Sequence, residues 1–169
     1  MKFILLLDYI IILVALWLIW PIIIGAPYVP TPMNKVRRML EIARLTDEDV
    51  LYDLGSGDGR IIINGAKMYS LKTVGIEADP IRYLWSKLVI FLNNLTGRVN
   101  VIWGNFNDTS LSDATVVTIY QRKGVNMGLK KKFLKELRPG ARIVSYMYEI
   151  EGWTPFSFDE ESKIYLYVI

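Results

Sequence analysis

The chain has 169 residues, enough for one domain of ordinary size. Its 20 Lys+Arg and 17 Asp+Glu give a formal net charge of +3, which does not predict a strong field for binding polyanions. Cysteine and histidine are both absent, so disulfides, thiol nucleophiles, Cys or His metal sites and histidine general bases are excluded. Any chemistry must use carboxylates, hydroxyls, amides, amines or a bound cofactor.

The first predicted element is an apolar segment from Phe3 to Ile24. A helix of this length spans about 33 Å, enough to cross the hydrocarbon core of a membrane. A secretory signal peptide has a shorter apolar run, and Gly25-Ala26-Pro27 is a poor cleavage site. A buried core helix is the other alternative, but a small domain has little room for a helix that is apolar on every side. We therefore expect residues 1–26 to form a transmembrane anchor and residues 27–169 to form the folded domain.

Positive charges flank this apolar segment unequally. Lys2 precedes it, whereas several cationic residues follow within about 20 positions: Lys35, Arg37, Arg38 and Arg44. The positive-inside rule then keeps the C-terminal part in the cytoplasm. The sequence predicts a single-pass membrane protein with its folded domain on the cytoplasmic side.

A stiff connector leads from the anchor to the first helix of the domain. Its prolines fix φ and restrict the residues that precede them. Thr31 is the expected N-cap, with Pro32 at the first helical position. Apolar residues then recur at i, i+3, i+4 and i+7 and predict the buried face of a short helix: Val36, Met39, Leu40 and Ala43.

From Asp49 onward, strands and helices alternate. The predicted strands are Val50–Leu54, Thr73–Glu77, Val99–Trp103, Thr115–Tyr120, Ala141–Ile150 and Ile164–Ile169. The predicted helices are Gly59–Tyr69, Ile81–Asn93 and Val125–Leu137. This alternation predicts a doubly wound α/β fold with a mostly parallel sheet. The helix Ile81–Asn93 is more apolar than one buried face requires; core packing is favoured over contact with an apolar acceptor or a bilayer.

A glycine-rich loop joins the first strand of this region to the next helix, where doubly wound folds bind nucleotide-type ligands. Gly55, Gly57 and Gly59 have the spacing G-x-G-x-G, with Ser56 between the first two, instead of the dinucleotide spacing G-x-G-x-x-G. Glycines allow a tight turn, and the helix N-terminus offers unpaired N–H groups. Because Asp53 ends the preceding strand, the loop favours a ligand with a positive ammonium group over a pyrophosphate. A generic glycine turn is the alternative.

Three further positions extend this prediction. Glu77 ends the second strand, where a carboxylate accepts hydrogen bonds from both ribose hydroxyls. After the third strand, Asn105 is the candidate partner of the adenine N6 amino group, and Phe106 is the candidate to cover the ring. Together these features favour S-adenosylmethionine over NAD. Tyr28 and Thr31 are candidates for a lid over the methionine end, with a plain connector and cap as the alternative.

The segments Asp53–Arg60, Glu77–Pro80 and Gly104–Phe106 resemble motifs of class I S-adenosylmethionine-dependent methyltransferases. The chain is also similar to archaeal protein-lysine methyltransferases and to the mitochondrial membrane-anchored lysine methyltransferase family, one member of which acts on the membrane rotor of ATP synthase. That narrower resemblance lies in Pro27–Pro32, Asp53–Arg60, Ala114–Thr118 and Glu149–Trp153. It implies a Rossmann-like, seven-stranded fold, S-adenosyl-L-methionine as methyl donor and lysine side chains of proteins as acceptors.

Methyl transfer to an amine needs a neutral amine but no histidine, because an apolar slot beside a positive sulfonium lowers the lysine pKa. Tyr120, which ends the fourth strand, is the candidate catalytic residue that orients the amine; a purely structural tyrosine is an equal alternative.

The expected partners are a protein substrate with an accessible lysine, membrane proteins included, and the membrane itself through residues 3–24. Nucleic acid is not expected, because no basic-aromatic face is evident in the sequence, and no metal site is predicted. A membrane-tethered methyltransferase of a small or lipid-like acceptor and a non-catalytic membrane-tethered binding module are the alternatives.

Overall fold

The computed structural model describes residues 7–12, 14–15 and 28–169. Most of the predicted anchor, residues 3–24, lies outside the described residues. Among the residues that are described, no helix is both long enough and apolar enough to cross a membrane. Residues 7–12 and 14–15 are helical, and their side chains are exposed.

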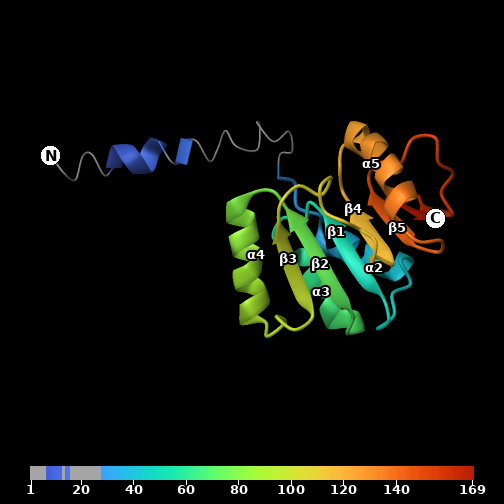
Figure 1. Cartoon of the computed structure of the whole chain (residues 1–169), viewed down its shortest axis with the longest axis horizontal. Coiled ribbons are helices and arrows are strands. Elements are labelled where there is room, and N and C mark those ends of the chain that lie inside the picture. The colour runs from blue at the N-terminus through green and yellow to red at the C-terminus, as the bar shows by residue number, and fades with distance from the viewer. Residues whose placement is uncertain (1–6, 13, 16–27) are drawn as a thin grey trace.

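A seven-stranded sheet forms the centre of the domain, in the order β3-β2-β1-β4-β5-β7-β6 (Figure 1). Its strands are β1 (Val50–Leu54), β2 (Lys72–Glu77), β3 (Val99–Trp103), β4 (Val116–Ile119), β5 (Arg142–Tyr146), β6 (Ser157–Asp159) and β7 (Ile164–Val168). Strands β1 to β5 pair in parallel, whereas β7 is antiparallel to both β5 and β6. The strand order reverses between β1 and β4, so the carboxyl ends of these two strands form the switch point of the sheet.

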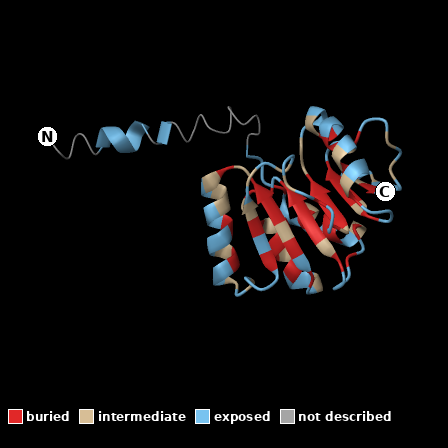
Figure 2. Ribbon diagram, in the orientation of Figure 1, coloured by how far each residue is buried: buried red, intermediate tan, exposed pale blue. Residues whose placement is uncertain are grey.

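Helices cover both faces of the sheet. They are α2 (Met33–Ile42), α3 (Arg60–Tyr69), α4 (Pro80–Leu92) and α5 (Lys123–Glu136). On one face Leu51 of β1 packs in a cluster with α2 and α3, and on the other Leu54 packs in a cluster with α5. Because side chains alternate across a strand and helices cover both faces of the sheet, the central strands are buried on both sides, and Figure 2 shows their arrows largely buried.

The predicted doubly wound α/β fold with a mostly parallel sheet is confirmed, with corrections at three places. The strand predicted over Ala141–Ile150 ends at Tyr146, because Met147 has a φ of 68°, in the left-handed region. Thr31 is not the N-cap: the structure places Pro32 there, without a side-chain capping hydrogen bond, and the helix begins at Met33. Strand β6 was not predicted, since three residues are too short to display a period.

Helix α4 departs from its expected packing. Its inner face contacts β3 through Ile90, which lies in a cluster with Val99 and Val101. Of the helix's 13 residues only Ser86 and Ile90 are buried. Core packing, the favoured explanation for the apolar composition of this helix, is therefore wrong for most of its apolar side chains.

An ion pair at the amino edge of the sheet joins three elements. Arg142, at the start of β5, pairs with Asp49 and donates hydrogen bonds to the carbonyl oxygens of Ala43 and Arg44 at 2.6 and 2.7 Å. Asp49 also accepts a hydrogen bond from the Thr115 hydroxyl at 2.6 Å. Burial opposes ionisation of Asp49, but these hydrogen bonds together hold its pKa below the ordinary value.

We expect Arg142→Met to lower the free energy of unfolding by about 2 kcal/mol, because it removes the cationic partner of Asp49 and the donor to the carbonyl oxygens of Ala43 and Arg44, which follow α2. The expected loss of free energy of unfolding is smaller than for a fully buried ion pair, since the Arg142 side chain is partly exposed. Urea unfolding measures the change. Arg37→Met, an exposed arginine on α2, is the matched control. Equal stability of the two variants would contradict a structural role for the ion pair.

Candidate functional site

A cavity of about 500 Å³ lies at the carboxyl ends of β1, β2 and β4. The connector before α2, the glycine loop and the segments that follow β2, β3 and β4 form its walls. It brings together every predicted site residue except Gly59: Tyr28, Thr31, Asp53, Gly55, Ser56, Gly57, Glu77, Asn105, Phe106 and Tyr120.

All three glycines of the loop adopt left-handed backbone conformations, with φ of 82° at Gly55, 58° at Gly57 and 81° at Gly59. A Cβ on Gly55 would lie 2.4 Å from Gln121 Nε2, and one on Gly57 would lie 3.1 Å from the Tyr28 ring. Gly59 is the N-cap of α3, and a Cβ there would meet Ser86 of α4 at 3.1 Å. Gly59 therefore serves the packing of α3 against α4 and does not line the cavity.

The backbone amides of the loop are already engaged. Gly55 N and Ser56 N donate to the Ile76 carbonyl oxygen at 2.9 and 3.0 Å, and Gly57 N donates to Glu77 Oε2 at 2.7 Å. The amides of Gly55, Ser56 and Gly57 are therefore not free to bind a phosphate. The loop presents carboxylates to the cavity instead, which favours a positively charged ligand.

Glu77 is a buried carboxylate that connects the loop to α4. Besides Gly57 N, it accepts a hydrogen bond from Asp79 N at 2.8 Å and lies 3.5 Å from Arg82 Nη2. A carboxylate has about four acceptor positions, so acceptor capacity remains on the side that faces the cavity. Glu77 fits the predicted role of binding ribose hydroxyls while also fixing the loop.

Asp53 differs from its acidic neighbours in the cavity wall. Asp58 pairs with Arg60 at 2.5 Å, whereas buried Asp53 accepts a hydrogen bond from the Thr118 hydroxyl at 2.8 Å and has no ion pair among the described residues. Burial raises the pKa of Asp53 to about 7, against the opposing effect of Thr118 and with a smaller contribution from the negative charge of Glu77. A ligand ammonium group would supply the missing countercharge.

The connector covers one side of the cavity. Arg60 Nη1 donates to the Thr31 carbonyl oxygen at 2.7 Å, and Arg82 Cζ lies 5.2 Å from the centroid of the Tyr28 ring. Burial raises the pKa of the Tyr28 hydroxyl, and the negative charge of Asp58 adds to this effect. Residues 28–31 therefore lie against the glycine loop and line the cavity.

Asn105 and Phe106 lie in the turn after β3. The Asn105 side-chain oxygen accepts a hydrogen bond from Asn107 N at 2.9 Å, and Phe106 packs against the core cluster that includes Leu54 and Ile76. The asparagine therefore also shapes the turn that brings both residues to the cavity wall. Its side-chain oxygen retains a second lone pair for a ligand.

Tyr120 lies one residue beyond β4, where it meets two further tyrosines. Its ring centroid is 4.7 Å from that of Tyr146 and 6.5 Å from that of Tyr148. The Ser145 hydroxyl donates to the Tyr148 carbonyl oxygen at 2.5 Å and fixes this turn. Burial raises the pKa of Tyr120. We call Tyr120, Tyr146 and Tyr148 the tyrosine cluster.

Sequence reasoning missed Tyr146, Tyr148, Gln121 and Arg82. Gln121 Nε2 donates to the Leu54 carbonyl oxygen at 2.8 Å and so crosses from β4 to β1 above Gly55. The two missed tyrosines had a signal, since Tyr146 ends β5, the next strand in the sheet after β4, and Tyr148 follows it closely. Arg82 had a local signal in its acidic neighbours Glu77 and Asp79, whereas Gln121 had none, because its partner Leu54 is distant in the sequence.

The chain matches known methyltransferases in sequence. Residues 53–157 match the family described as ANTKMT methyltransferase domain. A protein-lysine N-methyltransferase of Saccharolobus islandicus is 47% identical over 150 residues, which cover 85% of this chain and 93% of that protein. An adenine nucleotide translocase lysine N-methyltransferase of Mus musculus is 27% identical over 135 residues, covering 80% of this chain and 58% of that protein.

Among solved structures, an RNA methyltransferase from Salinibacter ruber in complex with S-adenosyl-L-homocysteine superimposes with a TM-score of 0.81. It is 38% identical in sequence, and the match covers 83% of this chain and 94% of that chain. S-adenosyl-L-homocysteine is the donor after loss of its methyl group, so this relative supports the cofactor that the sequence predicts.

We expect Gly55→Ala to weaken binding of S-adenosylmethionine at least tenfold and to lower the free energy of unfolding by about 2 kcal/mol. The added Cβ displaces Gln121 and forces a left-handed conformation on alanine. Calorimetry and urea unfolding measure the two effects. Gly128→Ala on α5, where a Cβ meets nothing within 4 Å, is the control and should leave binding unchanged. Unchanged binding in Gly55→Ala would show that the loop tolerates the side chain.

Proposed function

Because the chain belongs to the ANTKMT methyltransferase domain family and is an S-adenosylmethionine-dependent methyltransferase, we propose that it methylates lysine side chains of proteins. The observation that carries this proposal is the 47% identity to a protein-lysine N-methyltransferase, which extends over 93% of that relative. The cavity adds an independent argument, since its unpaired buried carboxylate and its tyrosine cluster suit a cationic cofactor and an amine acceptor.

In this proposal, different residues of the cavity wall bind different parts of the cofactor. Asp53 binds the ammonium group, and Glu77 accepts hydrogen bonds from the ribose hydroxyls. Asn105 and Phe106 bind the adenine, while Tyr28 and Thr31 close over the methionine end. When bound, the cofactor supplies an electrophilic methyl group on a sulfonium sulfur. The glycine loop, fixed by Glu77 and Gln121, sets the depth at which that ligand lies.

The acceptor amine must lose its proton before it attacks. With an ordinary lysine pKa near 10.4, deprotonation at pH 7 costs about 4.6 kcal/mol. An apolar, aromatic wall disfavours the charged form and so lowers this cost without a base. We assign Tyr120 the role of orienting the amine by its ring face, supported by Tyr146 and Tyr148. This position suits the role because Tyr120 is the member of the tyrosine cluster that lines the cavity.

We also propose that residues 1–26 attach the catalytic domain, residues 27–169, to the cytoplasmic face of a membrane as a single-pass protein. The support is the apolar sequence of residues 3–24 and the cationic residues that follow it. Side chains such as Leu7 and Ile11 are exposed in the described part of this segment, so the folded domain does not cover them. Lysines of membrane proteins close to the bilayer are then the natural acceptors.

A second candidate is methylation of RNA. It is favoured by the likeness to the Salinibacter ruber RNA methyltransferase. Against it stand the net charge of only +3 and the exposed carboxylates of Glu149 and Glu151, which follow the tyrosine cluster and share Lys123 as a counterion at 3.7 Å. A phosphate backbone is repelled by such carboxylates, whereas lysine-rich proteins are attracted.

The affinity for S-adenosylmethionine should depend on the ionisation of Asp53. Its pKa in the free protein is raised to about 7, so at pH 6 only about a tenth of the molecules carry the carboxylate that the ammonium needs. We expect the affinity to fall about fivefold between pH 7 and pH 6, with proton release on binding. Calorimetry between pH 6 and pH 7 measures both the affinity and the proton release. The α-amino group of the ligand stays mainly protonated in this range, so the change reports on Asp53. Asp53→Asn should bind weakly at both pH values; a flat wild-type profile would refute the assignment.

The acceptor can be identified by incubating the full chain with methyl-labelled S-adenosylmethionine, total membrane proteins, extracted lipids and RNA. We expect the label in acid hydrolysates of protein as methyllysine. Label confined to RNA would establish the second candidate, and label in lipid would establish a lipid-like acceptor; either result contradicts the lysine proposal.

The same assay tests the tyrosine cluster. We expect Tyr120→Leu to reduce turnover about tenfold with little change in cofactor affinity, because the ring face is lost. Tyr120→Phe keeps the ring and should retain most of the activity. An equal loss of turnover in both variants would show that the Tyr120 hydroxyl, and not the ring face, orients the amine.

A further inference from the structure

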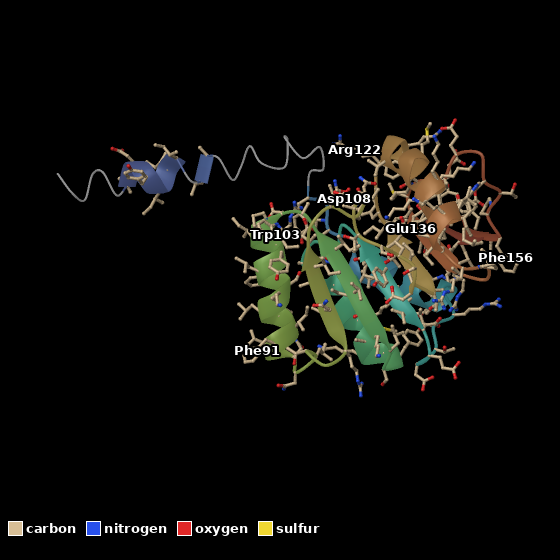
Figure 3. The ribbon with its side chains drawn as sticks, viewed as in Figure 1. Phe91, Trp103, Asp108, Arg122, Glu136 and Phe156 are labelled. Carbon is tan, nitrogen blue, oxygen red and sulfur yellow. The ribbon has the colours of Figure 1, made fainter. Side chains whose placement is uncertain are left out.

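The outer face of α4 carries a continuous apolar stripe. Its members are 48% to 67% exposed: Ile81, Leu84, Trp85, Leu88, Phe91 and Leu92. Their spacing of three and four residues places them on one side of the helix. Figure 2 shows α4 largely exposed along its length, and Figure 3 places Phe91 near one end of this helix and Trp103 near the other. Large exposed patches of this kind mark interaction surfaces.

Trp103 extends the stripe beyond the helix. It lies at the end of β3, is 62% exposed and stacks on Tyr83 of α4 with ring centroids 6.4 Å apart. Its indole Nε1 donates to the Ala78 carbonyl oxygen at 3.1 Å, which holds the ring beside the start of α4. These contacts hold Trp103 in place beside α4, so two segments of the chain form one surface. We call it the α4 surface.

Helix α4 and the segment that follows it carry charges of one sign. No Asp or Glu occurs between Pro80 and Arg98, whereas Arg82, Lys87 and Arg98 are present in this stretch. Lys87 Nζ lies 5.8 Å from the centroid of the Tyr83 ring, at the border of the stripe. Leu, Phe and Trp on one face with a cationic border are the composition of helices that lie in the interface of anionic bilayers.

The chain itself brings an apolar segment to this surface. Tyr28, the first residue described in the connector, packs under Arg82 in the first turn of α4. Ile24, the last residue of the apolar sequence, precedes Tyr28 by four positions, a distance of at most about 14 Å for extended chain. If that segment enters a bilayer, the start of α4 lies close to the bilayer surface.

We propose that the α4 surface lies in the interface of an anionic lipid bilayer and holds the domain against the membrane. The proposal rests on the membrane attachment proposed above and adds a second, independent contact. Arg82 belongs both to the cavity wall and to the first turn of α4, and Ala78, also in the cavity wall, lies two residues before the helix. Docking through α4 therefore keeps the mouth of the cavity at the level of the lipid headgroups. Only lysines close to the bilayer can then reach the cavity.

The absence of cysteine allows a clean test, since one introduced thiol takes the only label. Leu88→Cys is labelled with an environment-sensitive fluorophore in the full chain, which is then reconstituted with vesicles of phosphatidylcholine containing about 30% phosphatidylserine and a lipid-borne quencher. The matched control is Leu134→Cys on α5, a leucine of similar exposure on the other face of the sheet. We expect quenching of the label at Leu88→Cys to exceed that at Leu134→Cys at least threefold.

Equal quenching at the two positions in vesicle-bound protein overturns the α4 proposal and leaves the anchor standing. Failure of the full chain to sediment with the vesicles overturns both. A blue-shifted label at Leu88→Cys without vesicles would show that a second copy or the chain's own apolar segment covers the surface, and would also overturn it. Adding Leu84→Glu should abolish the quenching at Leu88→Cys while cofactor binding and methylation of a soluble lysine peptide stay unchanged.

Discussion

One buried carboxylate fixes the geometry on which the site depends. Glu77 ends β2 and accepts hydrogen bonds from the backbone of both the glycine loop and the residue that caps α4. Two segments that approach the cavity from different sides are thereby held to one side chain. A loop with three left-handed glycines has many accessible conformations, and the carboxylate selects the one that leaves the cavity open. The residue that we propose to bind the ribose is therefore also the one that fixes the loop.

The acids of the cavity wall have different surroundings, and this difference supports the proposed binding of a cationic group. Asp58 and Glu77 have arginine partners, whereas Asp53 is buried with a threonine hydroxyl and has no ion pair in the described part of the chain. A buried carboxylate without countercharge is costly to ionise. In the proposed complex a ligand ammonium removes that cost, so the burial of Asp53 would contribute to cofactor affinity.

The cavity, the tyrosine cluster and the α4 surface share the carboxyl edge of the sheet or border on it. This arrangement follows from the parallel topology, which brings the ends of β1, β2, β3 and β4 to one side. If the domain is held at a membrane as proposed, it selects its acceptor by position as well as by chemistry.

The sequence alone was sufficient to predict the order of the strands and helices apart from β6, the glycine loop and the roles proposed for Asp53 and Glu77, because periodicity, glycine spacing and strand ends are local properties. It also predicted the cofactor, since the residues that distinguish an ammonium from a pyrophosphate lie within a few positions of each other. Only the tertiary structure decided that Gln121 crosses above Gly55, that Tyr146 and Tyr148 join Tyr120, and that α4 exposes its apolar face. These depend on which strands become neighbours and on what packs over a helix, and both are set by contacts between residues far apart in the chain.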